Sequence, residues 1–141
     1  MTEVNGFRLA YRGMVAGLAA GWVWIAIAAV GLLLAGDPLA VRRSIAAGPP
    51  GNELITGLAL AQAAAGGIGL VFAYFFARYF TVRSTLELAA PAFAVLCWLL
   101  FSRFLGTDGS AWPAQLALLA AALGYGAMLG FATPTRGEVL R

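Results

Sequence analysis

Four long intervals of this 141-residue chain contain no charged residue. They cover residues 13–36, 54–77, 88–102 and 109–135. An α-helix rises ~1.5 Å per residue, so about 20 apolar residues cross the ~30 Å hydrocarbon core of a bilayer. The third interval is too short for this, and its helix must carry Glu87, Arg103 or both near the bilayer edge. The pattern predicts an all-α, polytopic integral membrane protein with four transmembrane helices.

The composition supports a membrane protein. Hydrophobic residues make up 62% of the chain and charged residues 11%, and the mean hydropathy is +0.87. A soluble domain of this size does not hide so much apolar surface. The apolar runs lack the period-two alternation that strands of a membrane barrel would show.

Turn and capping residues set the expected bounds of the helices. Asp37-Pro38 and Gly48-Pro49-Pro50 predict a short interfacial helix between the first two spans. Ser84 and Glu87 have the spacing of a capping box at the start of the third span. We expect one membrane domain over 1–141, with a polar arm over 1–12 and an antiparallel bundle. The expected segments are transmembrane helices over 13–36, 53–80, 86–105 and 111–132, and the interfacial helix over 38–47.

The arginines favour one orientation. Six lie in the N-terminal arm, the connector between the second and third spans, and the tail, whereas three lie on the opposite side. Loops rich in arginine stay in the cytoplasm, so we expect cytoplasmic termini in a cell membrane, specifically a bacterial inner membrane. The basic pI of about 9.6 then reflects this bias and affinity for anionic headgroups, not nucleic-acid binding.

Several kinds of chemistry lack the residues they need. The chain has no histidine and a single cysteine, Cys97, inside the third span. Haem ligation, a zinc site and a cysteine–histidine nucleophile are therefore not expected. We predict no catalytic residue, no metal and no cofactor held by specific ligands of this chain.

Small residues recur at every fourth position on three of the spans. This spacing allows helix backbones to approach closely, which favours helix association in lipid. We expect these rows to pack against helices of the same chain, of a second copy or of a different membrane subunit. The rows are Gly13, Gly17 and Gly21; Gly57, Ala61, Ala65 and Gly69; and Ala122, Gly126 and Gly130.

Five polar residues inside or beside the spans have two interpretations each. Gln62 and Gln115 either form interhelical hydrogen bonds or line a solute pathway. Arg78, Glu87 and Arg103 either extend to the headgroups or face a cavity or another subunit.

Two tryptophans lie near the middle of the first span, although tryptophan favours the membrane interfaces. Trp22 and Trp24 either fill hollows left by glycine-rich neighbours or form a wall for a bound lipid, quinone or pigment. Tyr74 and Trp98 are further candidates for such a contact.

The chain resembles the small four-helix DoxX-like membrane proteins. The resemblance rests on four spans in about 140 residues, DP after the first span, GG within the second and SRFLGTDG at the end of the third. It implies a place among accessory subunits of respiratory or oxidoreductase assemblies and assigns no functional residue.

Two functions are therefore expected from the sequence. The first is a non-catalytic small membrane subunit that packs through its Gly/Ala faces into a homo-oligomer or larger complex. The alternative is a transporter or channel for a small solute or ion, formed by oligomerisation. A lipid-modifying enzyme has less support, because no base, nucleophile or metal cluster is visible.

Overall fold

The computed structural model describes residues 3–36, 46, 48–104 and 112–135. These residues form helices and short connections without a strand, and four of the helices are long and apolar enough to cross a membrane. The prediction of an all-helical chain with four such helices is confirmed. The interfacial helix predicted over 38–47 lies outside the described residues. The four helices are α1 Glu3–Leu34, α3 Glu53–Val71, α4 Arg83–Phe104 and α5 Trp112–Ala132.

The first helix is longer than its uncharged interval. It begins at Glu3, within the segment expected to be a polar arm. The segment contains no proline that would break a helix, and Leu9 is buried in the core. Burial of Leu9 therefore stabilises the helical conformation of this segment. Arg8 and Arg12 lie on the exposed side of this extension.

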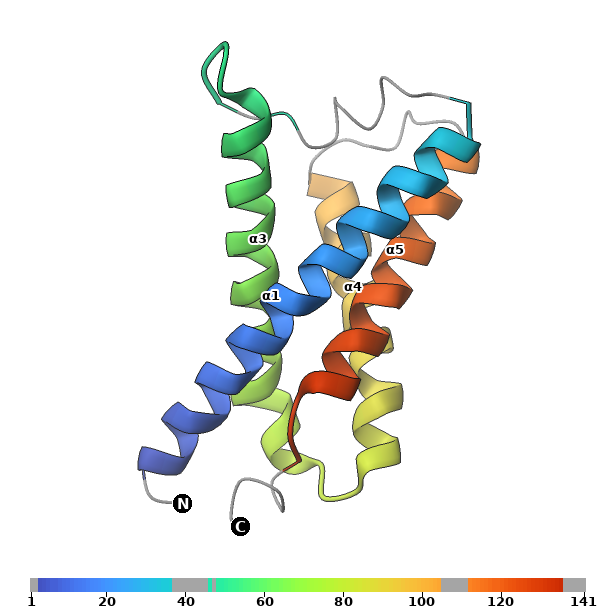
Figure 1. Cartoon of the computed structure of the whole chain (residues 1–141). Coiled ribbons are helices and arrows are strands. Elements are labelled where there is room, and N and C mark those ends of the chain that lie inside the picture. Colours follow the sequence, from blue (N-terminus) through green and yellow to red (C-terminus); the bar gives the residue numbers. More distant parts are fainter. Residues whose placement is uncertain (1–2, 37–45, 47, 105–111, 136–141) are drawn as a thin grey trace.

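Helix α1 crosses the molecule diagonally and holds the bundle together (Figure 1). It packs against both α3 and α5, and α4 packs against α5. Although α3 and α4 follow one another in the chain, they are not among the closely packed helix pairs. The start of α1 and the end of α5 lie at the same end of the bundle (Figure 1).

The end of α3 is irregular. A π-helical segment, η1 Phe72–Phe76, and a 3₁₀ turn, η2 Ala77–Tyr79, carry the helical path on to Tyr79. Phe72 and Phe76 both contact Phe93 of α4, with ring centroids 5.2 and 5.0 Å apart. This aromatic cluster joins α3 to α4 at one end of the bundle.

Glycines set the contact between α1 and α3. A Cβ added at Gly17 would overlap the carbonyl oxygen of Ala65, and one added at Gly69 would overlap that of Gly13. The two backbones therefore touch directly, which is the close approach that small residues permit.

The α4–α5 contact has the same character. A Cβ added at Gly126 would overlap Ala90 and Pro91, and Gly130 lies against Leu86 and Glu87 of α4. Pro91 lies inside α4, which continues past it. On the other side of α5, Ala117 and Gly124 approach α1.

Candidate ligand-binding cleft

An apolar cleft of about 320 Å³ lies among the four helices. Its buried lining includes Gly21 of α1 and Tyr125 of α5, whereas Ala64 of α3 and Phe101 of α4 are exposed. The cleft therefore opens between α3 and α4, the two consecutive helices that do not pack closely. Its lining consists of Gly21, Trp24, Ile25, Ala61, Ala64, Ala65, Ile68, Ala94, Cys97, Trp98, Phe101, Ala122 and Tyr125.

The helix pairing explains why the space exists. Small residues allow α3 to pack closely against α1, and α4 to pack closely against α5. At one end, Phe72, Phe76 and Phe93 fill the interval between α3 and α4. Farther along, α3 presents alanines such as Ala61 and Ala64, whose side chains are too short to reach the opposite wall.

Aromatic rings form much of the wall. Trp24 comes from α1, Trp98 and Phe101 from α4, and Tyr125 from α5. The lining includes no charged side chain, and its side-chain heteroatoms are the hydroxyl of Tyr125, the indole nitrogens and the thiol of Cys97.

Tyr125 links two helices across the bundle. It is 6% exposed, and its hydroxyl donates a hydrogen bond of 2.7 Å to the carbonyl oxygen of Ala65. Both partners line the cleft. Sequence reasoning missed this residue. The signal available was a hydroxyl in the middle of an uncharged span, between Gly124 and Gly126, because a polar group in such a span needs a partner.

Two of the four aromatic residues predicted to contact a ligand meet at the cleft. Trp24 and Trp98 are 74 positions apart in sequence and both line it. Trp22 is 59% exposed and is not part of the lining. Tyr74 belongs to η1, where it is exposed and packs edge-on against Phe75 at 5.0 Å.

Three of the five predicted polar residues lie near helix ends. Glu87 and Arg103 lie near opposite ends of α4, and Gln115 lies in the first turn of α5. None of the three lines the cleft. The side chain of Arg78 lies outside what the structure describes.

Gln62 is placed differently from the other polar residues. Its side-chain oxygen lies against Gly21 in the α1–α3 contact. Both polar atoms of its amide are buried and have no hydrogen-bond partner among the described residues. It neighbours the cleft through Gly21 and Ala61 but is not part of the lining.

The predicted small-residue rows lie largely inside the bundle. Gly13, Gly17 and Gly21 face α3, and Gly126 and Gly130 face α4. On α3, Ala65 and Gly69 meet α1, Gly57 is buried, and Ala61 lines the cleft together with Ala122 of α5. These contacts are made within one chain.

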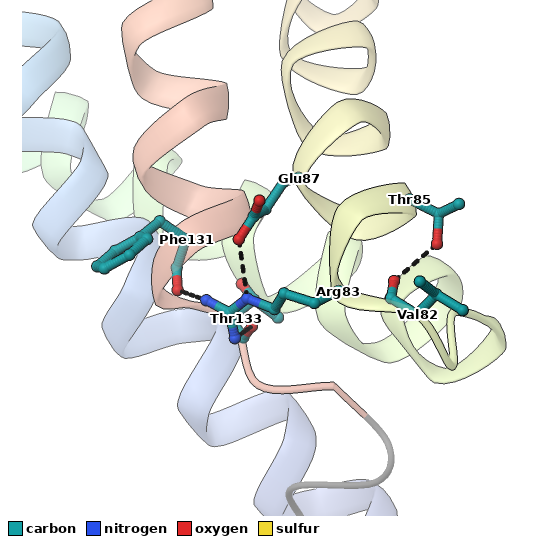
Figure 2. A network of polar contacts seen from close by, with 6 residues as sticks. All are labelled: Val82, Arg83, Thr85, Glu87, Phe131 and Thr133. Carbon is teal, nitrogen blue, oxygen red and sulfur yellow. Dashed lines mark hydrogen bonds and ion pairs between the residues drawn. The ribbon is translucent and has the colours of Figure 1, made fainter.

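A polar cluster joins the start of α4 to the end of α5 (Figure 2). The guanidinium of Arg83, at the start of α4, donates to the carbonyl oxygens of Phe131 and Thr133 at the end of α5. It also pairs with Glu87 at 3.0 Å and lies 5.7 Å from the centre of the Phe131 ring. Arg83 thus satisfies carbonyls that the end of a helix leaves without partners.

At the start of α4, the contacts of Arg83 and Thr85 are found in place of the capping box predicted from Ser84 and Glu87. Helix α4 begins at Arg83, so Ser84 lies inside its first turn. Glu87 accepts its hydrogen bond from Arg83, and Thr85 donates to the carbonyl oxygen of Val82 at 2.7 Å (Figure 2). Sequence reasoning treated Arg83 only as one of the orienting arginines.

Comparisons with protein-family models, with curated proteins and with solved structures found no match to this chain. Within the part of the chain that the structure describes, no group of three or more histidine, cysteine, aspartate or glutamate residues could hold a metal ion.

Proposed function

We propose that this chain is a small, non-catalytic integral membrane protein that binds an apolar molecule of the bilayer in the cleft between α3 and α4. Its four long helices cross the membrane as an antiparallel bundle. Four crossings return the chain to the side where it began. The arginine distribution favours the cytoplasmic side of a cell membrane for both termini.

The cleft carries this proposal. Its lining is uncharged, and large apolar residues such as Leu60, Leu96 and Leu100 are exposed on α3 and α4. In a bilayer such residues contact lipid, so the mouth between the two helices faces hydrocarbon. An uncharged pocket with aromatic walls then favours an apolar occupant.

The size of the cleft suits a small molecule. Its volume is about 320 Å³. It falls at the lower end of the ~300–1,000 Å³ range of sites for small molecules.

Assembly with other subunits stays a prediction, as does the accessory role that the resemblance to DoxX-like proteins implies. The small-residue rows face one another within the chain, so they no longer require a partner to explain them. The alternative of a transporter receives no support from the cleft, because none of its lining residues is charged.

Two neighbouring alanines of α3 provide the test. Ala63 and Ala64 are both exposed, but only Ala64 lines the cleft. The wild type, Ala64→Phe and Ala63→Phe would be purified in a mild detergent, and the co-purifying lipids extracted and quantified by mass spectrometry. We expect one apolar species to be retained by the wild type and Ala63→Phe, and to be depleted in Ala64→Phe.

Two results would contradict the proposal. One is equal retention of every lipid species by all three proteins. The other is a change in oligomer size in Ala64→Phe without loss of any lipid, which would assign the cleft to a protein partner.

A further inference from the structure

We infer that the molecule bound in the cleft is a neutral lipid alcohol whose hydroxyl group donates a hydrogen bond to the Tyr125 hydroxyl oxygen. This inference rests on the proposed function and narrows it to one class of ligand. It follows from the hydrogen-bonding capacity of the groups that line the cleft.

The hydroxyl proton of Tyr125 is already donated to the carbonyl oxygen of Ala65. A tyrosine hydroxyl has one proton to donate and oxygen lone pairs that accept. The carbonyl oxygen of Ala65 has no proton, so in the 2.7 Å contact between them Tyr125 is the donor. What the Tyr125 oxygen can still offer is an acceptor position. Tyr125 and Ala65 both line the cleft, so the hydrogen bond between them joins two residues of its wall.

The other side chains of the lining complement an alcohol better than an acid, an amine or a simple carbonyl compound. No arginine is present to pair with an anion, and no carboxylate to pair with a cation. The indole nitrogens of Trp24 and Trp98 are donors and the Cys97 thiol is a weak one, and the amide of Gln62 lies outside the lining. A carbonyl oxygen can accept from the indoles, but it leaves the Tyr125 oxygen without a donor. A ligand hydroxyl can donate to the Tyr125 oxygen and also accept from an indole N–H, and its hydrocarbon body lies beside Trp24, Trp98 and Phe101.

The bond to Ala65 also holds the tyrosine in place. It joins the Tyr125 side chain of α5 to the backbone of α3, so the Tyr125 oxygen has a fixed position before a ligand enters. An acceptor that is already ordered costs little additional side-chain entropy on binding. Tyr125 therefore distinguishes an alcohol from an ether of the same shape.

The test uses two matched quenchers of tryptophan fluorescence, dibromostearyl alcohol and its methyl ether, in lipid nanodiscs. Trp22 and Trp112 are exposed and lie outside the lining, so both are replaced by phenylalanine, leaving Trp24 and Trp98 beside the cleft. Bulk quenching is measured on Ala64→Phe in the same background and subtracted.

We expect the alcohol to reach half-maximal quenching at a mole fraction roughly two- to tenfold lower than the ether, the range of one net hydrogen bond. Tyr125→Phe should bind the ether as before and lose the preference. Tyr11→Phe, which removes an exposed hydroxyl outside the lining, should keep it.

The possible failures are distinguishable. If neither compound quenches above the Ala64→Phe baseline, the proposed function itself is wrong. If both compounds quench above that baseline, and equally, with the unsubstituted Tyr125, then the cleft binds lipid but the alcohol inference is wrong. This comparison does not depend on whether Tyr125→Phe folds. A preference that survives in folded Tyr125→Phe, or that disappears in Tyr11→Phe, would also overturn the role of Tyr125.

Discussion

At the scale of single residues, Tyr125 contributes both to the cleft and to the contact between two helices. Its ring lines the cleft and its hydroxyl joins α5 to the carbonyl of Ala65. A hydroxyl buried in an apolar interior is costly unless it forms a hydrogen bond. The pairing with Ala65 removes that cost and at the same time fixes the distance between two helices that surround the cleft.

Removal of this hydroxyl should weaken the bundle. We expect Tyr125→Phe to lower the free energy of unfolding by about 1 kcal/mol, the net value of one hydrogen bond. The measurement is reversible unfolding in mixed micelles by titration with sodium dodecyl sulfate. Tyr11→Phe, on an exposed ring of α1, is the control and should unfold like the wild type. Equal effects of the two substitutions would contradict the role given to the Tyr125 hydroxyl.

At the scale of helices, pairs of small residues decide which elements touch. On α1, Gly17 meets the backbone of Ala65 and the Cα of Gly69. On α5, Gly126 meets Ala90 and Pro91 of α4. Each contact brings two backbones together where any Cβ would have to displace main-chain atoms, and the resulting van der Waals contact stabilises helix pairs in lipid.

Two glycines test this explanation directly. We expect Gly17→Ala to destabilise the protein by about 1–3 kcal/mol, the usual range for overpacking, because the new methyl overlaps the Ala65 carbonyl. Gly67→Ala is the matched control, since an added Cβ there meets nothing within 4 Å. The control should be neutral or stabilising by up to ~1 kcal/mol through helix propensity. Unfolding by dodecyl sulfate measures both, and an equally stable Gly17→Ala would contradict the packing explanation.

The junction of α4 and α5 depends on Arg83. We expect Arg83→Ala to cost about 1–2 kcal/mol of unfolding free energy, because the carbonyls of Phe131 and Thr133 lose a charged donor. Glu87→Gln should cost less than ~1 kcal/mol, since its ion pair with Arg83 is exposed. Arg8→Ala, on the exposed side of α1, serves as the control in thermal unfolding. If Glu87→Gln matched Arg83→Ala, the ion pair and not the helix cap would be the stabilising contact.

At the scale of the whole molecule, the order of packing produces the cleft. Helix α1 holds α3 on one side and α5 on the other, and α5 in turn holds α4. Because α3 and α4 lack such a contact along most of their length, the space between them is bounded by α1 and α5 and open at one side. The aromatic cluster around Phe93 closes only one end.

The proposed orientation can be tested with single cysteines in a Cys97→Ser background. Asn52 and Val82 are exposed and lie beyond opposite ends of the helical path from α3 to η2. We expect a membrane-impermeant maleimide to label Asn52→Cys in intact cells, and to label Val82→Cys only after the membrane is permeabilised. The reverse pattern would place the termini outside the cytoplasm.

The number of long apolar helices could be predicted from the sequence. Their signal is local, because a bilayer demands about 20 apolar residues in a row and charges mark the ends. The small-residue rows were visible for the same reason. The start of α1 was misjudged, since the arginines that resemble a loop there project from a helix whose opposite side, with Leu9, is buried.

Which of these rows meet, and what lies between them, depends on how the helices pack in three dimensions. Rows of glycine and alanine on three helices are interchangeable in sequence, so nothing local shows that Gly17 faces Ala65 or that Gly126 faces Pro91. Tyr125 and Ala65 are 60 positions apart, and the cleft that they line is a space, not a segment. Its existence follows from the pairing of α1 with α3 and of α4 with α5, which the close approach of distant backbones determines.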